Sequence, residues 1–137
     1  MESRERFAYV NGELIPESRA SVSIFDSAIM TGDTVTESTR TFNHAPYKLR
    51  EHIERLIRSA RAAYMELPWV ADDLERITLE FMDVNADLYA RGEDRWITHN
   101  LSRGPSVTTP PELRAGLGFG QPTLMIFESP MKDVAGS

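Results

Sequence analysis

The stretch at residues 22–56 constrains the fold of this chain most, because it predicts two extended segments that lead directly into an amphipathic helix. Residues 34–42 are rich in threonine, valine and phenylalanine, which favour a strand, and residues 45–49 return as a second strand after a turn. A helix is expected from about 50 to 65. Its apolar residues recur at the spacing of one helical face: Ile53, Leu56, Ile57, Ala60 and Tyr64.

A second hairpin is expected near the amino terminus. Asn11-Gly12 supplies the positive φ angles of a two-residue turn, so residues 7–10 and 13–15 are predicted to pair as antiparallel strands. Pro16 ends the second strand, because proline cannot donate a backbone hydrogen bond. The other expected elements are a short strand (22–24), one helical turn capped by Asp26 or Ser27 and ended by Gly32, a second helix (from Asp72 or Asp73 to about Leu88, ended by Gly92), a strand (96–101), a long loop (102–122), a buried strand (123–127) and a polar tail (128–137).

Together these patterns predict an α+β fold, a small antiparallel sheet with two main helices packed on one face. A chain of 137 residues with 41% apolar content is long enough to bury a core as one domain. The net charge of −6 argues against binding to a nucleic-acid backbone, which requires a basic face. Nucleic acid is therefore not an expected partner.

Metal and membrane sites are not expected either. The chain has no cysteine, and its three histidines, His44, His52 and His99, lack the spacing of metal ligands. His52 in the first helical turn is expected to pack rather than to catalyse. No run approaches 18 apolar residues, and the amino terminus lacks the apolar core of a signal peptide. We therefore expect a cytoplasmic protein without a membrane partner.

Two features of this stretch indicate a candidate site. The predicted strand 34–42 is polar on both faces, so it either lines a wet cavity or forms an edge strand exposed to solvent. Arg55 lies near the start of the following helix, where a guanidinium and free helix N–H groups suit a phosphate. The alternative is an ordinary solvated arginine, and the pattern alone leaves both interpretations open.

Five short motifs occur in an order that resembles a known family. They are Asn11-Gly12, Ser23-Ile24-Phe25-Asp26, Gly32-Asp33-Thr34-Val35-x-Glu37, Arg40, and Leu49-x-Glu51-His52-x-x-Arg55-Leu56. The series resembles the amino-terminal lobe of class IV aminotransferases, the fold-type-IV enzymes that use pyridoxal 5'-phosphate (PLP). This family includes branched-chain and D-amino-acid aminotransferases, amine transaminases and aminodeoxychorismate lyase. The resemblance is strongest over about residues 8–65.

The resemblance implies a cofactor, substrates and site residues. The cofactor is PLP, and Arg55 matches the arginine that binds its phosphate. The substrates are an amino acid, branched-chain-like, and a 2-oxo acid, and the assembly is a homodimer. Residues 1–129 correspond to the small lobe, and residues 130–137 to the start of an inter-lobe linker. The positions that match the substrate pocket of the family are Thr31, Thr36, Glu37, Arg40 and Thr98.

Several departures leave the substrate open. Several members carry aromatic residues where Thr31 and Thr36 stand, so both the substrate and the choice between aminotransferase and lyase are undetermined. Residues 102–104 resemble the Thr-Arg-Gly of the D-amino-acid branch, but the arginine and histidine that trap a carboxylate there have no counterpart. Arg40 is expected either to meet a substrate carboxylate or to pair with Glu37 or Glu13.

The family's cofactor-binding lysine has no match in this chain, whose lysines are Lys48 and Lys132. In the family that lysine comes from a second, larger lobe. The resemblance therefore predicts the amino-terminal part of a longer aminotransferase, inactive by itself. One alternative is a stand-alone, non-catalytic lobe for dimerisation and small-molecule binding, and another is an acidic interaction module.

Overall fold

A computed structural model describes residues 4–131 and contains a six-stranded antiparallel sheet in the order β2-β1-β6-β5-β3-β4. The three central pairs, β1–β6, β6–β5 and β5–β3, bring distant parts of the chain together. The strands are β1 (Phe7–Val10), β2 (Glu13–Pro16), β3 (Thr34–Phe42), β4 (Ala45–Pro46), β5 (Arg95–Ser102) and β6 (Thr123–Pro130).

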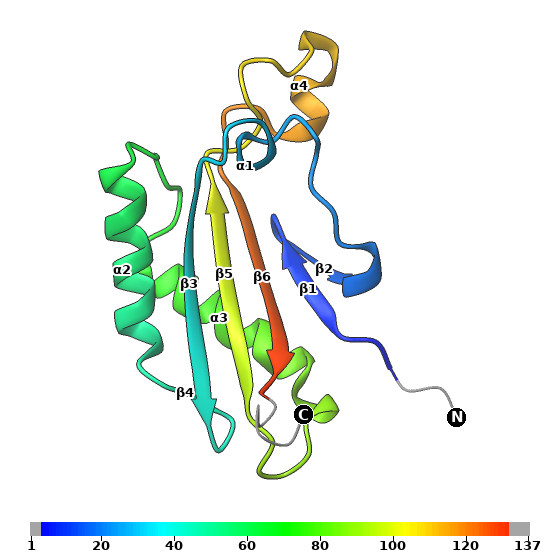
Figure 1. Cartoon of the computed structure of the whole chain (residues 1–137), viewed down its shortest axis with the longest axis vertical. Coiled ribbons are helices and arrows are strands. Elements are labelled where there is room, and N and C mark those ends of the chain that lie inside the picture. Colours follow the sequence, from blue (N-terminus) through cyan, green and yellow to red (C-terminus); the bar gives the residue numbers. More distant parts are fainter. Residues whose placement is uncertain (1–3, 132–137) are drawn as a thin grey trace.

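Two long helices cover one face of this sheet, and Figure 1 shows α3 behind the strands and α2 beside β3. Within residues 4–131, no α-helix covers the central strands on the opposite face, which we call the helix-free face. None of the helices described is long and apolar enough to span a membrane. The predicted α+β fold is confirmed. The helices are α1 (Ser27–Met30), α2 (Leu49–Ala62), α3 (Ala71–Val84) and α4 (Pro111–Leu117), with short 3-10 turns η1 (Glu17–Arg19) and η2 (Ala86–Leu88).

The core lies between the sheet and these two helices. Ile53 and Leu56 on α2 are each 1% exposed, and Ile97 on β5 is fully buried. Burying one such side chain contributes about 1.5–3 kcal/mol, so the predicted apolar stripe of α2 holds the helix against the sheet. The same cluster includes Ala60, Leu74, Phe81, Leu101, Leu124 and Ile126.

Both hairpin turns follow from residues that tolerate positive φ. Asn11 and Gly12 have φ angles of 47° and 88°, which confirms the predicted two-residue turn between β1 and β2. Asn43 and His44 have φ angles of 54° and 69° and connect β3 to β4 in the same way. However, β4 ends at Pro46 and is shorter than the strand expected at 45–49.

Two loop predictions are wrong. Residues 22–24 form no strand, and the neighbouring Asp26 makes only an isolated bridge to Pro105. The long loop 102–122 contains α4, which begins at Pro111 because the first helical position needs no N–H donor. Gly118 ends α4 in the left-handed region, with a φ angle of 74°.

The predicted polar tail is also wrong for residues 128–130, which continue β6. The Glu128 carboxylate accepts a hydrogen bond from Arg95 Nη1 at 3.0 Å, and the two side chains are 0% and 3% exposed. Burial raises the pKa of Glu128, and the charge of Arg95 opposes this rise. Residues 132–137 lie outside the described residues, so the division into a lobe at 1–129 and a linker at 130–137 stays a prediction.

Candidate functional site

The strand β3 divides the predicted site residues between the two faces of the sheet. Thr36 and Ser38 are exposed on the helix-free face, whereas Glu37 is buried beneath the helices. β5 extends the helix-free face, because Thr98 lies opposite Ser38 and Asn100 lies opposite Thr36. Thr36 and Thr98 therefore share one face, and Glu37 lies on the other.

Arg55 reaches from α2 to β3 and forms a bidentate ion pair with Glu37. Its Nε donates to Oε1, and its Nη2 donates to Oε2 at 2.9 Å. The Glu37 side chain is 6% exposed, and that of Arg55 is 61% exposed. The hydrogen bond to Glu37 raises the pKa of Arg55. A buried carboxylate therefore fixes a charged guanidinium whose other side faces solvent.

A histidine lies beside this ion pair in the core. His99 stands opposite Glu37 in the pairing of β5 with β3 and is 1% exposed. Its Nε2 lies 2.8 Å from Thr78 Oγ1, and this hydroxyl already donates to Leu74 O, so Nε2 carries the proton. Burial lowers the pKa of His99 to about 4. His52 packs on the other side, with Nδ1 3.9 Å from Glu37 Oε1.

Arg40 forms no ion pair with Glu37, which is bound by Arg55, and none with Glu13. Its guanidinium carbon lies 3.7 Å from the centre of the Phe42 ring. Its Nε donates to the carbonyl of Thr41 at 3.1 Å. Among residues 4–131, no protein acceptor binds its Nη groups. Arg40 is therefore a cation held in place by an aromatic ring.

Thr31 lies at the end of α1, the predicted helical turn that the structure confirms. Asp26 caps α1 and accepts hydrogen bonds of 2.6 Å from the hydroxyls of Ser102 and Thr123. These bonds tie α1 to the ends of β5 and β6. The Thr31 hydroxyl donates to Ser27 O at 3.0 Å, and its side chain is exposed. Thr31 thus lies at the end of α1 and is separate from the polar residues that β3 and β5 present on the helix-free face.

Asn100 is a residue of this face that the sequence did not single out. Its Nδ2 donates to Thr36 Oγ1 at 3.0 Å, and its Oδ1 is buried without a partner among residues 4–131. Alternation along β5 indicates that residues 96, 98 and 100 share a face. Which residues of β3 they meet depends on the register of two strands more than 50 residues apart.

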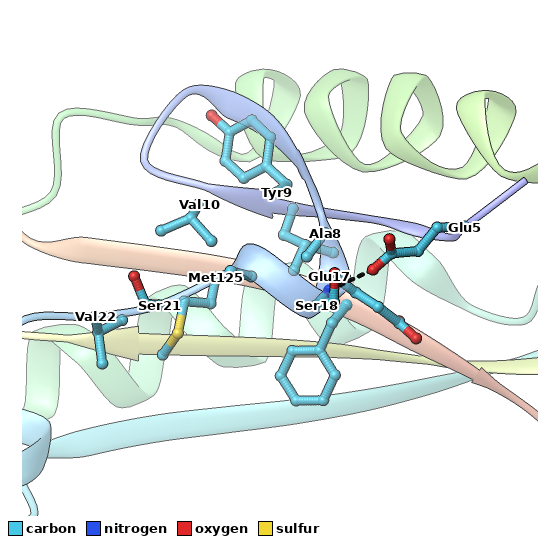
Figure 2. A pocket seen from close by; sticks show the side chains of 12 residues that line it. Glu5, Ala8, Tyr9, Val10, Glu17, Ser18, Ser21, Val22 and Met125 are labelled. Carbon is cyan, nitrogen blue, oxygen red and sulfur yellow. Dashed lines mark hydrogen bonds between the residues drawn. The ribbon is translucent and has the colours of Figure 1, made fainter.

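A hollow of about 580 Å³ lies farther along the helix-free face, over β1 and β6 (Figure 2). Residues 17–22 cross above the strands and enclose it together with Val10 and Met125. At one end the Glu5 carboxylate accepts a hydrogen bond from the Ser18 N–H at 2.5 Å. The lining is mostly apolar, and it includes neither Arg55 nor any of the predicted pocket residues.

The arrangement therefore supports anion binding and hydrogen bonding. Arg55 presents a fixed positive charge at the edge of β3, and the hydroxyls of Thr36, Ser38 and Thr98 are available on the helix-free face. Within residues 4–131, no group of three or more acidic or histidine side chains is arranged to hold a metal ion.

Comparisons with known proteins agree with this fold. The family model "Amino-transferase class IV" matches residues 34–132. A putative branched-chain-amino-acid aminotransferase of Methanocaldococcus jannaschii is 35% identical over 85 residues, which is 61% of this chain and 30% of that protein. Branched-chain-amino-acid aminotransferase-like protein 1 of Arabidopsis thaliana is 30% identical over 108 residues, or 79% of this chain and 19% of that protein.

Solved structures show the same fold. A branched-chain aminotransferase from Thermoproteus uzoniensis, crystallised with norvaline, has a TM-score of 0.74 at 24% identity and covers 95% of this chain and 42% of that protein. The chain thus spans less than a third of the curated relatives and less than half of this structure. Because the family model matches most of its length, the chain belongs to the class IV aminotransferases. Its sheet and helices correspond to the amino-terminal lobe of these proteins.

Proposed function

We propose that this chain forms the small lobe of a PLP-dependent aminotransferase that transfers an amino group between an amino acid, branched-chain-like, and a 2-oxo acid. The observation that carries the proposal is the exposed guanidinium of Arg55, held by the buried Glu37. Family membership supplies the reaction class, and the relatives named as branched-chain aminotransferases support the substrate class. In this proposal Arg55 binds the phosphate of the cofactor.

The geometry of Arg55 fits a phosphate group. A guanidinium carries five N–H donors in one plane. Glu37 occupies the side formed by Nε and Nη2, so the side formed by Nη1 and Nη2 stays open toward solvent. That open side is the one that binds an oxyanion through two parallel hydrogen bonds. Because Glu37 fixes the guanidinium in advance, little rotamer entropy is lost on binding.

The remaining residues of the site bind and orient the substrate. PLP, when bound, supplies the electron sink for amino-group transfer. The helix-free face offers hydroxyls at Thr36 and Thr98, and Arg40 offers to a substrate carboxylate its Nη groups, which no acceptor within residues 4–131 binds. We assign the role of the cofactor-binding lysine to neither lysine of this chain. Lys48 is exposed at the start of α2, with Nζ 5.5 Å from the centre of the Tyr47 ring, and Lys132 lies outside the described residues.

We also propose that the protein is a cytoplasmic homodimer. The segment around α1 exposes three large apolar side chains, Ile24, Ile29 and Met30, at 69%, 60% and 46%. Apolar groups gathered on one exposed segment are typical of a surface that another protein covers. Sedimentation equilibrium of the purified protein measures its mass in solution and tests this assembly.

Cofactor retention tests the role of Arg55. The protein encoded by the complete gene, loaded with PLP, is compared with its Arg55→Ala variant and with Arg58→Ala, a change one turn further along the exposed face of α2. We expect Arg55→Ala to weaken cofactor binding by about 10- to 100-fold, because charged hydrogen bonds to the phosphate are lost. Arg58→Ala should retain the cofactor.

A parallel urea titration separates binding from folding. Arg55→Ala also leaves the buried Glu37 carboxylate without its cation, so the unfolding midpoint of this variant is expected to fall. The double variant Arg55→Ala with Glu37→Gln removes that unpaired charge. If the double variant recovers the midpoint of the cofactor-free protein and still loses PLP, Arg55 acts on the cofactor. Recovery of PLP together with stability would show that Arg55 is structural. Absence of any amino-group exchange between amino acids and 2-oxo acids in the complete protein would overturn the proposed reaction.

A further inference from the structure

Four polar residues form a group on the helix-free face, opposite the face on which Glu37 binds Arg55, and we call it the polar block: Thr36, Ser38, Thr98 and Asn100. Thr98 faces Ser38 and Asn100 faces Thr36 across two neighbouring strands. Side chains paired in this way have Cβ atoms about 4.5–5.5 Å apart. The polar block therefore presents three hydroxyls and one carboxamide on two neighbouring strands.

The hydrogen bond within the polar block orients the Thr36 hydroxyl. Asn100 Nδ2 donates to Thr36 Oγ1, so this oxygen acts as the acceptor. The single hydroxyl hydrogen of Thr36 is thereby left to donate elsewhere, and its side chain is exposed on this face. Thr36 is therefore a donor fixed in position by its neighbour before any ligand arrives.

We propose that the polar block selects a substrate with an uncharged, hydrogen-bonding side chain, a hydroxyl or carboxamide, in preference to an aliphatic one of similar size. Thr36, oriented by Asn100, is the specificity-determining residue. This inference rests on the proposed amino-group transfer, and it assigns a polar side chain in place of the branched-chain-like one that the names of the relatives support. It departs from the branched-chain substrates that the names of the relatives give for those proteins.

The physical argument is the cost of unpaired polar groups. An aliphatic side chain laid on the polar block would remove water from its hydroxyls without replacing their hydrogen bonds, which is unfavourable. A hydroxyl or carboxamide would restore those bonds. Met125 and Phe127 on β6 pair directly with Asn100 and Thr98, so apolar side chains border the polar block on that side. Farther along the same face, Trp96 on β5 and Phe42 on β3 are exposed. In this proposal the end of the substrate side chain lies against the polar block, between these apolar neighbours.

Two acceptors of nearly equal size test this selection without depending on stereochemistry. In 2-oxo-4-hydroxybutanoate a hydroxyl stands where 2-oxopentanoate has a methyl group. In the complete PLP-loaded protein, we expect kcat/KM to be about tenfold or more higher for the hydroxylated acid, since a site built to bind a hydroxyl rejects the analogue that lacks it.

The variants Thr36→Val and Thr108→Val separate the polar block from general effects. Thr36→Val keeps the shape of the side chain but removes the donor, so the ratio of the two kcat/KM values should fall toward one. Thr108 is exposed in the loop before α4, and its hydroxyl bonds to Ser106 Oγ at 2.6 Å and not to the polar block, so Thr108→Val should leave the ratio unchanged. A wild-type preference for 2-oxopentanoate, or an unchanged ratio in Thr36→Val, would overturn the inference.

A binding measurement on the chain itself needs no cofactor. In ¹H–¹⁵N spectra, 4-hydroxybutanoate should shift the side-chain amide signals of Asn100 in the wild type and much less in Thr36→Val, and pentanoate should shift them little in either. Equal shifts with both acids would contradict the inference. If the complete protein turns over no 2-oxo acid, the proposed reaction is wrong. The binding measurement then tests the selectivity of the polar block independently of that reaction.

Discussion

Lowering the pH should destabilise this protein through one buried histidine. His99 is 1% exposed between the sheet and α3, and burial lowers its pKa from 6.5 to about 4. The unfolded chain, in which the imidazole is solvated, binds the proton more tightly. Stability that is fully present above pH 6.5 is therefore lost as the pH falls toward 4.

The size of this effect follows from the two pKa values. The difference between 6.5 and about 4 corresponds to about 3 kcal/mol in full, of which about 2 kcal/mol is lost by pH 5. Small domains have unfolding free energies of about 5–15 kcal/mol, so the loss is large. With a urea slope of about 2 kcal/mol per molar, the midpoint should fall by about 1 M between pH 7.5 and pH 5.

The variant His99→Gln isolates this contribution. A glutamine amide can still donate to Thr78 Oγ1, but it does not titrate. We expect urea unfolding, followed by circular dichroism at pH 7.5, 6 and 5, to show about 2 kcal/mol more loss in the wild type than in His99→Gln. The change His44→Gln, at the hairpin tip, controls for the loss of a histidine. Parallel pH dependence in the wild type and His99→Gln would refute the reasoning.

Two further predictions concern stability and are measured by urea unfolding at pH 7.5. Replacing Arg95 by Met leaves the Glu128 carboxylate buried without its cation and should lower the free energy of unfolding by about 3–5 kcal/mol. The double change Arg95→Met with Glu128→Leu should recover most of that loss. A double variant no more stable than the single one would contradict this prediction. Gly104→Ala should destabilise the fold more than Gly92→Ala. Both glycines have a positive φ, which costs about 1–3 kcal/mol for alanine. At Gly104 the added Cβ would also lie 1.9 Å from the carbonyl oxygen of Gln121, whereas at Gly92 it would meet no atom within 4 Å. Equal losses would show that the close approach at Gly104 relaxes freely.

The sequence predicted the elements whose signals are local. The Asn11-Gly12 turn and the apolar stripe of α2 depend on residues only a few positions apart. The structure confirms the turn and the stripe from Ile53 to Ala60, but α2 ends at Ala62, and Tyr64, predicted to belong to the stripe, is 89% exposed beyond it. The helix α4 was missed because the prolines and glycines around it also favour a loop. They proved to be its start and its end, at Pro111 and Gly118.

The contacts that build the candidate site were harder to predict, because they join distant residues. Alternation along β3 correctly separates Glu37 from Thr36, but it cannot show that Arg55, 18 residues later, binds that carboxylate. Asn100 meets Thr36 across 64 residues, and this pairing depends on the order of strands in the sheet. The family resemblance named Arg55 and the threonines as site residues, and their roles stay predictions.

The most direct test of the account is whether Arg55 binds the phosphate of the cofactor. Pyridoxine 5'-phosphate, which lacks the reactive aldehyde, is titrated into the ¹⁵N-labelled chain while the arginine Nε–H signals are followed. We predict that the Nε–H signal of Arg55, which is bound to Glu37, shifts with added ligand, and that Arg55→Ala weakens binding by about 10- to 100-fold while Arg58→Ala does not change it. An Arg55 signal that stays in place while other residues respond, or equal binding by Arg55→Ala, would contradict the central claim.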